Sequence, residues 1–249
     1  MTSTPMPRAL RLGFAISGAG LALNLLAAVL IGLEVGDAQA LDTARVALMW
    51  AMLPPIAIAL VRIGALRHGV GAWHVLAVLL CWLGDGLGAS TGITIVLLGA
   101  FLLGHLAYLA ALWPTRRRSL ALGPAAIGYA IIAVIAGGIT AANAGALAVP
   151  VLLYALVLAA MAAFAAIDTP GLLGGLLFLV SDLVLGLGLF VLDIPDPLRT
   201  FAVLIPYLGA QMLLAISLQQ RLGLRAGAAA APRRAGAALR TPSGHHRTD

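Results

Sequence analysis

The chain has 249 residues, of which 62% are hydrophobic and only 10% are charged, and its mean hydropathy is +1.06. A soluble globular domain usually has about 25% charged residues, so this composition excludes one. All 15 basic residues are arginines, and they exceed the 9 acidic residues by 6. They lie between or beyond long apolar runs instead of forming one basic stripe, which is typical of membrane topology and excludes nucleic acid as a partner.

Eight apolar stretches are long enough to cross a bilayer, whose hydrocarbon core of about 30 Å requires about 20 residues of helix. They are too long for barrel strands, and a helix satisfies its own backbone groups within lipid. We therefore predict an all-α, polytopic integral membrane bundle of eight transmembrane helices, in a bacterial-type inner membrane. The stretches cover residues 12–33, 46–63, 70–88, 91–113, 119–139, 146–167, 171–192 and 197–219.

Arginine placement predicts the orientation of the bundle, because loops with excess arginine stay in the cytoplasm. If the N-terminus is cytoplasmic, only Arg45 and Arg199 fall on the outer side, and both termini face the cytoplasm. The cytoplasmic side then holds Arg8, Arg11, Arg62, Arg67, Arg116, Arg117, Arg118, Arg221, Arg225 and the tail arginines. The outer loops hold Glu34, Asp37, Asp42, Asp193 and Asp196.

The two ends of the chain differ in character. The first apolar run is longer than the 7–15 residues typical of a signal-peptide core, so we expect it to remain as a span. Residues 221–249 are rich in Ala, Gly, Pro and Arg and nearly lack large apolar residues. We expect residues 1–220 to form the transmembrane domain and residues 221–249 a disordered, basic cytoplasmic tail. The sequence does not indicate an oligomeric state.

Three ionisable side chains fall inside predicted spans, where such groups are costly and indicate function. They are Asp85 in the third span, His105 in the fourth and Asp182 in the seventh, and all three could line one cavity. Neutral polar residues occur at similar depth, and we regard them as candidates for binding or orienting a substrate. These are Asn24, Tyr108, Tyr154, Ser181, Tyr207 and Gln211.

Small residues accompany both aspartates. Gly84 and Gly86 flank Asp85, and a glycine-rich segment, 171–175, precedes Asp182. Such spacings let helix backbones approach closely. Close packing would bring the two carboxyl groups into one dry pocket, where one stays neutral while the other is ionised. That division suits acid–base catalysis. A helix-bridging hydrogen bond or an ion pathway is the alternative for either aspartate alone.

A metal site is a second interpretation of the same residues. Asp85, His105 and Asp182 could in principle hold zinc, but no span contains a His-x-x-x-His or similar ligand spacing. Cys81 is the only cysteine, so a thiolate cluster is excluded. We predict that the protein uses no metal and no cofactor.

The polar motifs resemble those of the YhhN family of eight-span membrane proteins, which includes lysoplasmalogenases related to transmembrane protein 86. The resemblance covers the third to eighth predicted spans in order. It is carried by Leu83-Gly84-Asp85, the run 99–108 with His105 and Tyr108, Tyr154 and Met161, the run 174–182 with Ser181 and Asp182, and the run 207–211 with Tyr207 and Gln211.

The resemblance implies hydrolysis of the vinyl ether bond of a lysoplasmalogen to a fatty aldehyde and a glycerophospho-alcohol. Asp85 and Asp182 would be catalytic, and a lysophospholipid-like molecule drawn from the membrane lipids would be the substrate. Two other functions stay open from the residues alone. One is a proton-coupled lipid or small-solute transporter that uses Asp85, His105 and Asp182 as a proton relay. The other is a metal-dependent intramembrane lipid hydrolase.

Overall fold

The computed structural model describes residues 6–119, 123 and 125–238, except for the side chains at 125–126 and 224–238. Within that part of the chain every regular element is a helix, as predicted. The longer helices are α1 (Arg8–Gly32), α2 (Ala38–Met52), α3 (Pro54–Arg62), α4 (Gly69–Thr91), α5 (Thr94–Leu112), α6 (Ala125–Asn143), α7 (Ala148–Ala165), α8 (Thr169–Phe190) and α9 (Asp196–Ala238). Short 3-10 turns are η1 (Ala65–Arg67), η2 (Trp113–Arg118) and η4 (Gly145–Leu147).

Seven segments are long and apolar enough to cross a membrane, which makes the chain an integral membrane protein. They correspond to seven of the eight predicted spans. The second span is made of α2 and α3 together and begins at Ala38, earlier than the predicted start at residue 46. The fifth predicted span falls on α6, whose apolar described part, Ile127–Asn143, is shorter than the other spans. Residues 120–122 and 124 of that predicted span lie outside the described residues.

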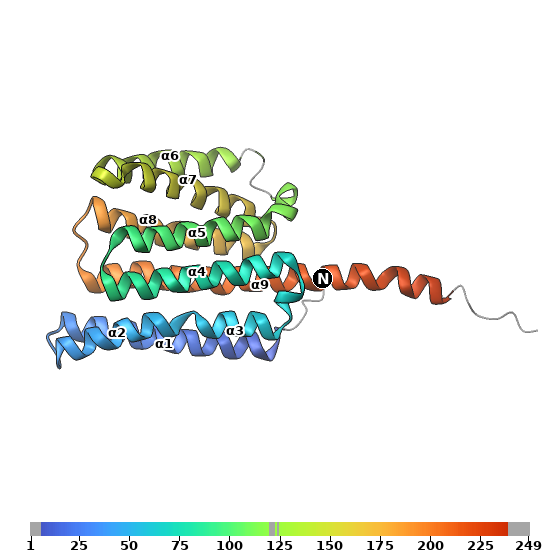
Figure 1. Cartoon of the computed structure of the whole chain (residues 1–249), viewed down its shortest axis with the longest axis horizontal. Helices are drawn as coiled ribbons and strands as arrows, with labels where there is room; N and C mark the ends of the chain where they lie inside the picture. The colour runs from blue at the N-terminus through green and yellow to red at the C-terminus, as the bar shows by residue number, and fades with distance from the viewer. Residues whose placement is uncertain (1–5, 120–122, 124, 239–249) are drawn as a thin grey trace, which may run out of the picture.

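The last helix continues past the predicted end of the transmembrane domain. Its apolar segment is Asp196–Gly223, but its backbone is helical as far as Ala238. In Figure 1 this part of α9 projects from the bundle at the end where α1 begins. The predicted tail therefore starts as a continuation of α9, and residues 239–249 lie outside the described residues.

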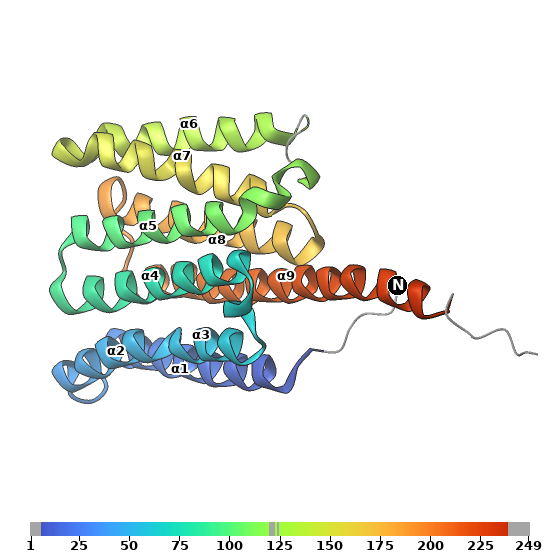
Figure 2. The same cartoon turned by 45° about the vertical axis from the view of Figure 1, so that its right-hand side comes forward.

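The contacts between helices close the seven long spans into a ring, which Figures 1 and 2 show from the side. Contacts run from α1 to α2, from α2 to α4, then through α5, α7, α8 and α9, and from α9 back to α1. Helix α6 lies outside the ring against α7 and α8. This order brings α4 and α8, which carry the two intramembrane aspartates, to positions that both face the middle of the ring.

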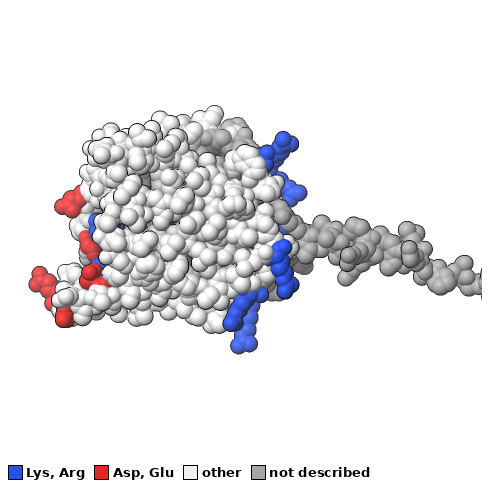
Figure 3. All heavy atoms as spheres, viewed as in Figure 1, with Lys and Arg blue, Asp and Glu red and all other residues white. Residues whose placement is uncertain are grey.

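The two ends of the bundle differ in charge. Figure 3, drawn from the same side as Figure 1, shows arginines gathered at the end of the bundle where α1 begins and acidic residues at the opposite end. The acidic end holds the α1–α2 and α8–α9 connections, as the sequence predicts. One detail is different: Asp42 and Asp196, which we expected in outer loops, are helical. Asp42 belongs to α2, as does Arg45, and Asp196 lies in the first turn of α9, as does Arg199.

Local sequence signals explain where several helices begin. The Asp168 side chain accepts a hydrogen bond from the Gly171 backbone at 2.7 Å, and this N-cap satisfies an otherwise free donor at the start of α8. The other Asp168 oxygen accepts from Ser217 of α9 at 2.9 Å, which fixes α8 against α9. Pro54 and Pro55 interrupt the second span after Leu53, because proline lacks the donor that a continuous helix requires.

Glycines let the helices beside the aspartates pack closely. A Cβ atom on Gly86 would lie 2.3 Å from the Trp50 ring of α2, and one on Gly175 would lie 2.9 Å from the backbone oxygen of Ala162 in α7. Only glycine fits at both positions, as the small-residue spacings predict. The neighbour of Gly175 is backbone, so it cannot turn aside.

Gly175→Ala should therefore lower the free energy of unfolding by about 1–3 kcal/mol, the usual cost of overpacking. Gly99→Ala in α5 is the matched control, because a Cβ there meets no atom within 4 Å. That change should be neutral or stabilising by up to about 1 kcal/mol, since alanine favours helix over glycine. Unfolding in detergent, followed by circular dichroism, measures both. Equal effects of the two changes would contradict this packing.

Candidate functional site

A cavity of about 450 Å³ opens inside the ring toward the acidic end of the bundle. Six helices contribute to its wall, and its lining combines charged, polar and apolar side chains. The polar members are Asn24, Asp42, Arg45, Asp85, Ser181, Asp182, Asp196, Arg199, Thr200 and Tyr207. Asp85 and Asp182 thus line one common cavity although they belong to helices that are far apart in the chain.

Asp85 extends from α4 and is 3% exposed. Its Oδ2 accepts a hydrogen bond from the Tyr207 hydroxyl of α9 at 2.7 Å. No arginine in the described part of the chain forms an ion pair with it. The carboxyl group is therefore oriented by a neutral donor and keeps its second oxygen for another partner in the cavity.

Asp182 extends from α8 and has a similar arrangement. Its Oδ2 accepts a hydrogen bond from the Tyr154 hydroxyl of α7. The Nε2 atom of His105 in α5 lies 3.6 Å from the same oxygen, which is a close contact but longer than a hydrogen bond. The histidine is fully buried. Each aspartate is thus oriented by one tyrosine from a different helix.

Aromatic rings surround the buried groups. The Phe178 ring lies 4.8 Å from that of His105 and 5.5 Å from that of Tyr207, measured between centroids. The Phe101 ring lies 5.6 Å from that of Tyr207. Both arrangements are edge-on or tilted, as aromatic pairs prefer. These rings pack against the tyrosine and histidine that contact the two carboxyl groups.

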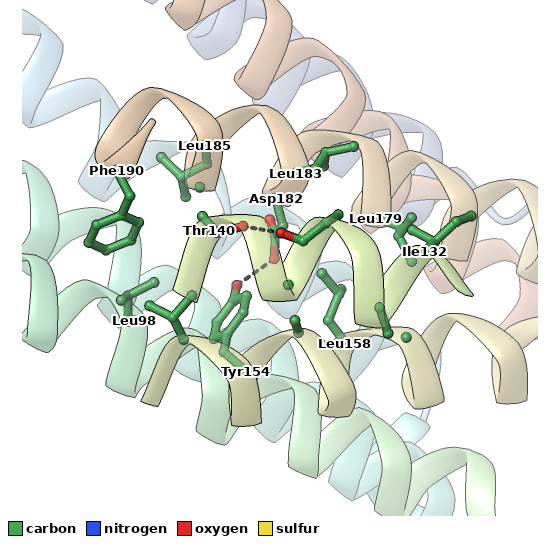
Figure 4. Close-up of a pocket in the computed structure, with 17 residues that line it drawn as sticks. Leu98, Ile132, Thr140, Tyr154, Leu158, Leu179, Asp182, Leu183, Leu185 and Phe190 are labelled. Atoms are coloured by element: carbon green, nitrogen blue, oxygen red, sulfur yellow. Dashed lines mark hydrogen bonds between the residues drawn. The ribbon is translucent and has the colours of Figure 1, made fainter. Parts of the chain in front are cut away.

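A second, smaller hollow of about 60 Å³ lies on the other side of Asp182, between α6, α7 and α8. Figure 4 shows Asp182 and Tyr154 at its centre, among Leu98, Leu158, Leu179 and Phe190. The Thr140 hydroxyl donates to the Ala136 carbonyl in its own helix. The hollow is otherwise apolar. Asp182 and Leu185 line both spaces, so Asp182 stands where the polar cavity meets the apolar hollow.

The other predicted site residues divide between the cavity wall and a place outside it. Asn24 and Ser181 line the cavity, but the Ser181 hydroxyl donates to the Val203 carbonyl at 3.0 Å. The Asn24 amide donates to the Arg45 carbonyl at 3.2 Å. Tyr108 and Gln211 lie outside the cavity wall and bind each other, with the hydroxyl donating to Oε1 at 2.5 Å. This last pair joins α5 to α9 and does not contact the aspartates through any hydrogen bond in the described structure.

Sequence analysis missed the charged groups at the outer end of the cavity. Arg45 donates to Asp196 at 2.7 Å and to the Thr200 hydroxyl at 2.9 Å, and Arg199 donates to Asp196 at 3.0 Å. We interpreted both arginines only as topology signals. The signal for a site was their position, because they are the two arginines that fall on the outer side in the orientation predicted from arginine placement.

No set of three His, Cys, Asp or Glu side chains in the described part of the chain is grouped so that it could hold a metal ion. The three residues considered for zinc are arranged differently: His105 contacts Asp182, and Asp85 bonds to Tyr207. The site therefore presents two carboxyl groups with neutral donors. Such a site can hold a proton on one carboxyl group and keep a negative charge on the other.

Comparison with known proteins assigns the family. The sequence profile of the YhhN family matches residues 45–218, well over half of the chain and including nearly all the cavity lining. The chain belongs to the YhhN family. No curated protein and no solved structure matches it. Membership in the YhhN family confirms the resemblance drawn from the motifs around Asp85, His105 and Asp182, and the match extends beyond it into the second span.

Removal of either tyrosine hydroxyl should destabilise this YhhN protein. Tyr154→Phe and Tyr207→Phe each leave a buried carboxyl oxygen without its donor, which costs about 1–3 kcal/mol. Tyr129→Phe in α6 is the control, because its buried hydroxyl has no hydrogen-bond partner in the described structure. That change should be neutral or slightly stabilising. Chemical unfolding in detergent measures all three. An equal loss in Tyr129→Phe would contradict the assigned hydrogen bonds.

Proposed function

We propose that this protein hydrolyses the vinyl ether bond of a lysoplasmalogen, an alkenyl-glycerophospholipid, to a fatty aldehyde and a glycerophospho-alcohol. The observation that supports this most directly is the cavity shared by Asp85 and Asp182, two buried carboxyl groups from helices that are distant in the chain. Family membership adds to it, because the YhhN motifs resemble those of lysoplasmalogenases.

The chemistry requires two groups with opposite roles. A neutral carboxyl group protonates the β-carbon of the vinyl ether, and the double-bond electrons form the new C–H bond. The adjacent carbon and the ether oxygen then share the positive charge of an oxocarbenium ion. A carboxylate stabilises this cation, as in glycosidases, and accepts a proton from the attacking water. The resulting hemiacetal gives its hydroxyl proton to the first carboxyl group, now ionised, and its bond to the glycerol oxygen breaks. The departing oxygen takes the proton that the second carboxyl group accepted from water, so aldehyde and alcohol are released and both groups regain their starting states.

Asp85 and Asp182 supply these two roles, and Tyr207 and Tyr154 hold one oxygen of each group in place. Preorganised donors of this kind avoid reorganisation when charge develops. His105 lies 3.6 Å from the Oδ2 atom of Asp182 and packs beside it without lining the cavity. The cavity supplies space for water, whereas the hollow beyond Asp182 is apolar and suits the alkenyl chain.

We further propose that α6 also crosses the membrane, which brings the total to eight spans. Both termini are then cytoplasmic in a bacterial-type inner membrane. Helix α6 runs alongside α7 in both views (Figures 1 and 2), and α1 begins at the end from which α9 projects. The arginine-rich end then faces the cytoplasm under the positive-inside rule. The cavity opens at the other end, so a substrate enters from the outer leaflet.

Asp85→Asn and Asp182→Asn should each lower aldehyde release by about 10²–10⁴-fold, because each removes a proton donor or a charge stabiliser. Asp193→Asn is the matched control, because Asp193 is exposed and does not line the cavity. It should retain wild-type turnover. The measurement is aldehyde released from a purified lysoplasmalogen in detergent, at equal amounts of folded protein. Near-normal turnover in both cavity variants would remove the two-carboxylate mechanism.

The same assay separates the two rival functions. Release of aldehyde by detergent-solubilised protein requires an enzyme, whereas a proton-coupled transporter would move solute only in sealed vesicles. A metal-dependent hydrolase would lose activity on treatment with a chelator and regain it with added metal. Activity that persists after exhaustive chelation supports acid–base chemistry by the aspartates.

The apolar hollow predicts how the enzyme responds to the length of the substrate's alkenyl chain. Ala136→Phe would fill a space of only about 60 Å³ beside Asp182 and should raise KM for long alkenyl chains more than for short ones. Val134→Phe is the control, because that side chain is 62% exposed on the outer face of α6. Steady-state kinetics with two chain lengths measure the ratio. The same KM ratio in wild type and Ala136→Phe would show that the chain lies elsewhere.

A further inference from the structure

Two arginines occupy the outer end of the cavity, although membrane proteins generally carry their arginines on the cytoplasmic side. Arg45 of α2 has only 17% of its side chain exposed, and Arg199 of α9 has 39% exposed. Both line the same cavity as the two aspartates. The chain contains no lysine, so an anion that enters here meets arginine only.

Internal partners satisfy these arginines incompletely. Arg45 uses Nη1 for Asp196 and Nη2 for Thr200, but its Nε–H is buried and has no hydrogen-bond partner in the described structure. Arg199 uses Nη2 for Asp196. One carboxylate therefore serves two guanidinium groups. A buried donor without a partner is costly, and an oxyanion that accepts from it would recover that cost.

We propose that Arg45 and Arg199 form the subsite for the phosphate group of a lysophospholipid at the outer end of the cavity. Guanidinium groups bind phosphate oxygens through paired, charge-assisted hydrogen bonds. Asp196 occupies this position when no substrate is bound and is displaced from at least one arginine by the phosphate. This inference rests on the proposed function, because it assigns a substrate class to that same cavity.

The spacing in the cavity fits such a molecule. Thr200, which binds Arg45, and Tyr207, which binds Asp85, are seven residues apart on α9, about 10 Å at 1.5 Å per residue. In a lysoplasmalogen seven bonds join the phosphorus atom to the β-carbon of the vinyl ether. An extended chain advances about 1.2 Å per bond, so this distance is about 8 Å. A phosphate bound by the arginines thus brings the reacting double bond to the aspartates.

Two carboxylates also lie at this end of the cavity. Asp196 bonds to both arginines and is 41% exposed in its side chain, whereas Asp42 is exposed and forms no ion pair in the described structure. The end of the cavity therefore carries two positive and two negative groups. This balance suits a headgroup with its own positive charge beyond the phosphate, because Asp42 is free to face that charge.

The test measures binding of lipids that cannot react. A saturated ether lysolipid, 1-O-alkyl-glycerophosphoethanolamine, is compared with 1-O-alkyl-glycerol, which lacks the phosphate, and with glycerophosphoethanolamine, which lacks the chain. Isothermal titration in detergent gives the affinity of the purified full-length protein for each. Wild type should bind the phosphate-bearing lipid at least about ten-fold more tightly than either of the other two.

Arg45→Gln and Arg199→Gln should each reduce that preference about ten-fold and leave binding of the neutral ether lipid unchanged. Asp196→Asn should strengthen binding of the phosphate-bearing lipid, because it removes the competing carboxylate. A purely structural ion pair predicts the opposite, since Asp196→Asn would then weaken binding as the arginine variants do. Arg67→Gln, in η1 at the other end of the bundle, is the control and should match wild type.

The outcomes separate this subsite from the proposed reaction. If aldehyde is released from lysoplasmalogen but the arginine variants keep the phosphate preference, the subsite is wrong and the reaction stands. If the preference disappears in those variants but no aldehyde forms, the subsite stands and the reaction is wrong. Binding of glycerophosphoethanolamine as tightly as the whole lipid would overturn the assignment to a lipid phosphate.

Discussion

The burial of two carboxyl groups without an arginine partner is the constraint on which the rest of this structure depends. A lone carboxylate in a low-dielectric interior is very costly, and a group in that position either accepts strong hydrogen bonds or holds a proton. Here Tyr207 donates to Asp85 and Tyr154 donates to Asp182. The four residues come from four helices, so the ring of spans must close correctly before either carboxyl group is satisfied.

Close helix packing makes that arrangement possible. The glycines on both sides of Asp85 and before Asp182 bring neighbouring backbones and rings within contact distance. Sequence analysis predicted this from small-residue spacing, and it also predicted the all-helical fold and the helices that carry the two aspartates. The length of the apolar runs was sufficient to predict these features, because a segment that crosses lipid can form only a helix or a strand of a closed barrel.

Other features depended on tertiary contacts that the sequence does not encode locally. Arg45 and Arg199 were interpreted only as topology signals, yet the helices α2 and α9 place both in the cavity wall. Tyr108 and Gln211 shared depth and polarity with the cavity residues, but they bond to each other instead. Depth within a span was predictable, whereas the direction in which a polar side chain points depended on which helices became neighbours.

The lining changes from charged to apolar between the mouth of the cavity and the hollow beyond Asp182, and this order determines how the proposed substrate lies in the protein. Charged groups line the outer end of the cavity, carboxyl groups with neutral donors lie deeper, and an apolar hollow follows beyond Asp182. An amphiphile matches that order only with its headgroup outward and its chain inward. Its polar–apolar junction, which in a lysoplasmalogen is the vinyl ether, then lies beside Asp182. In the proposed reaction the attacking water comes from the cavity, so the nucleophile and the departing glycerol oxygen share the polar side while the aldehyde chain stays in the apolar one.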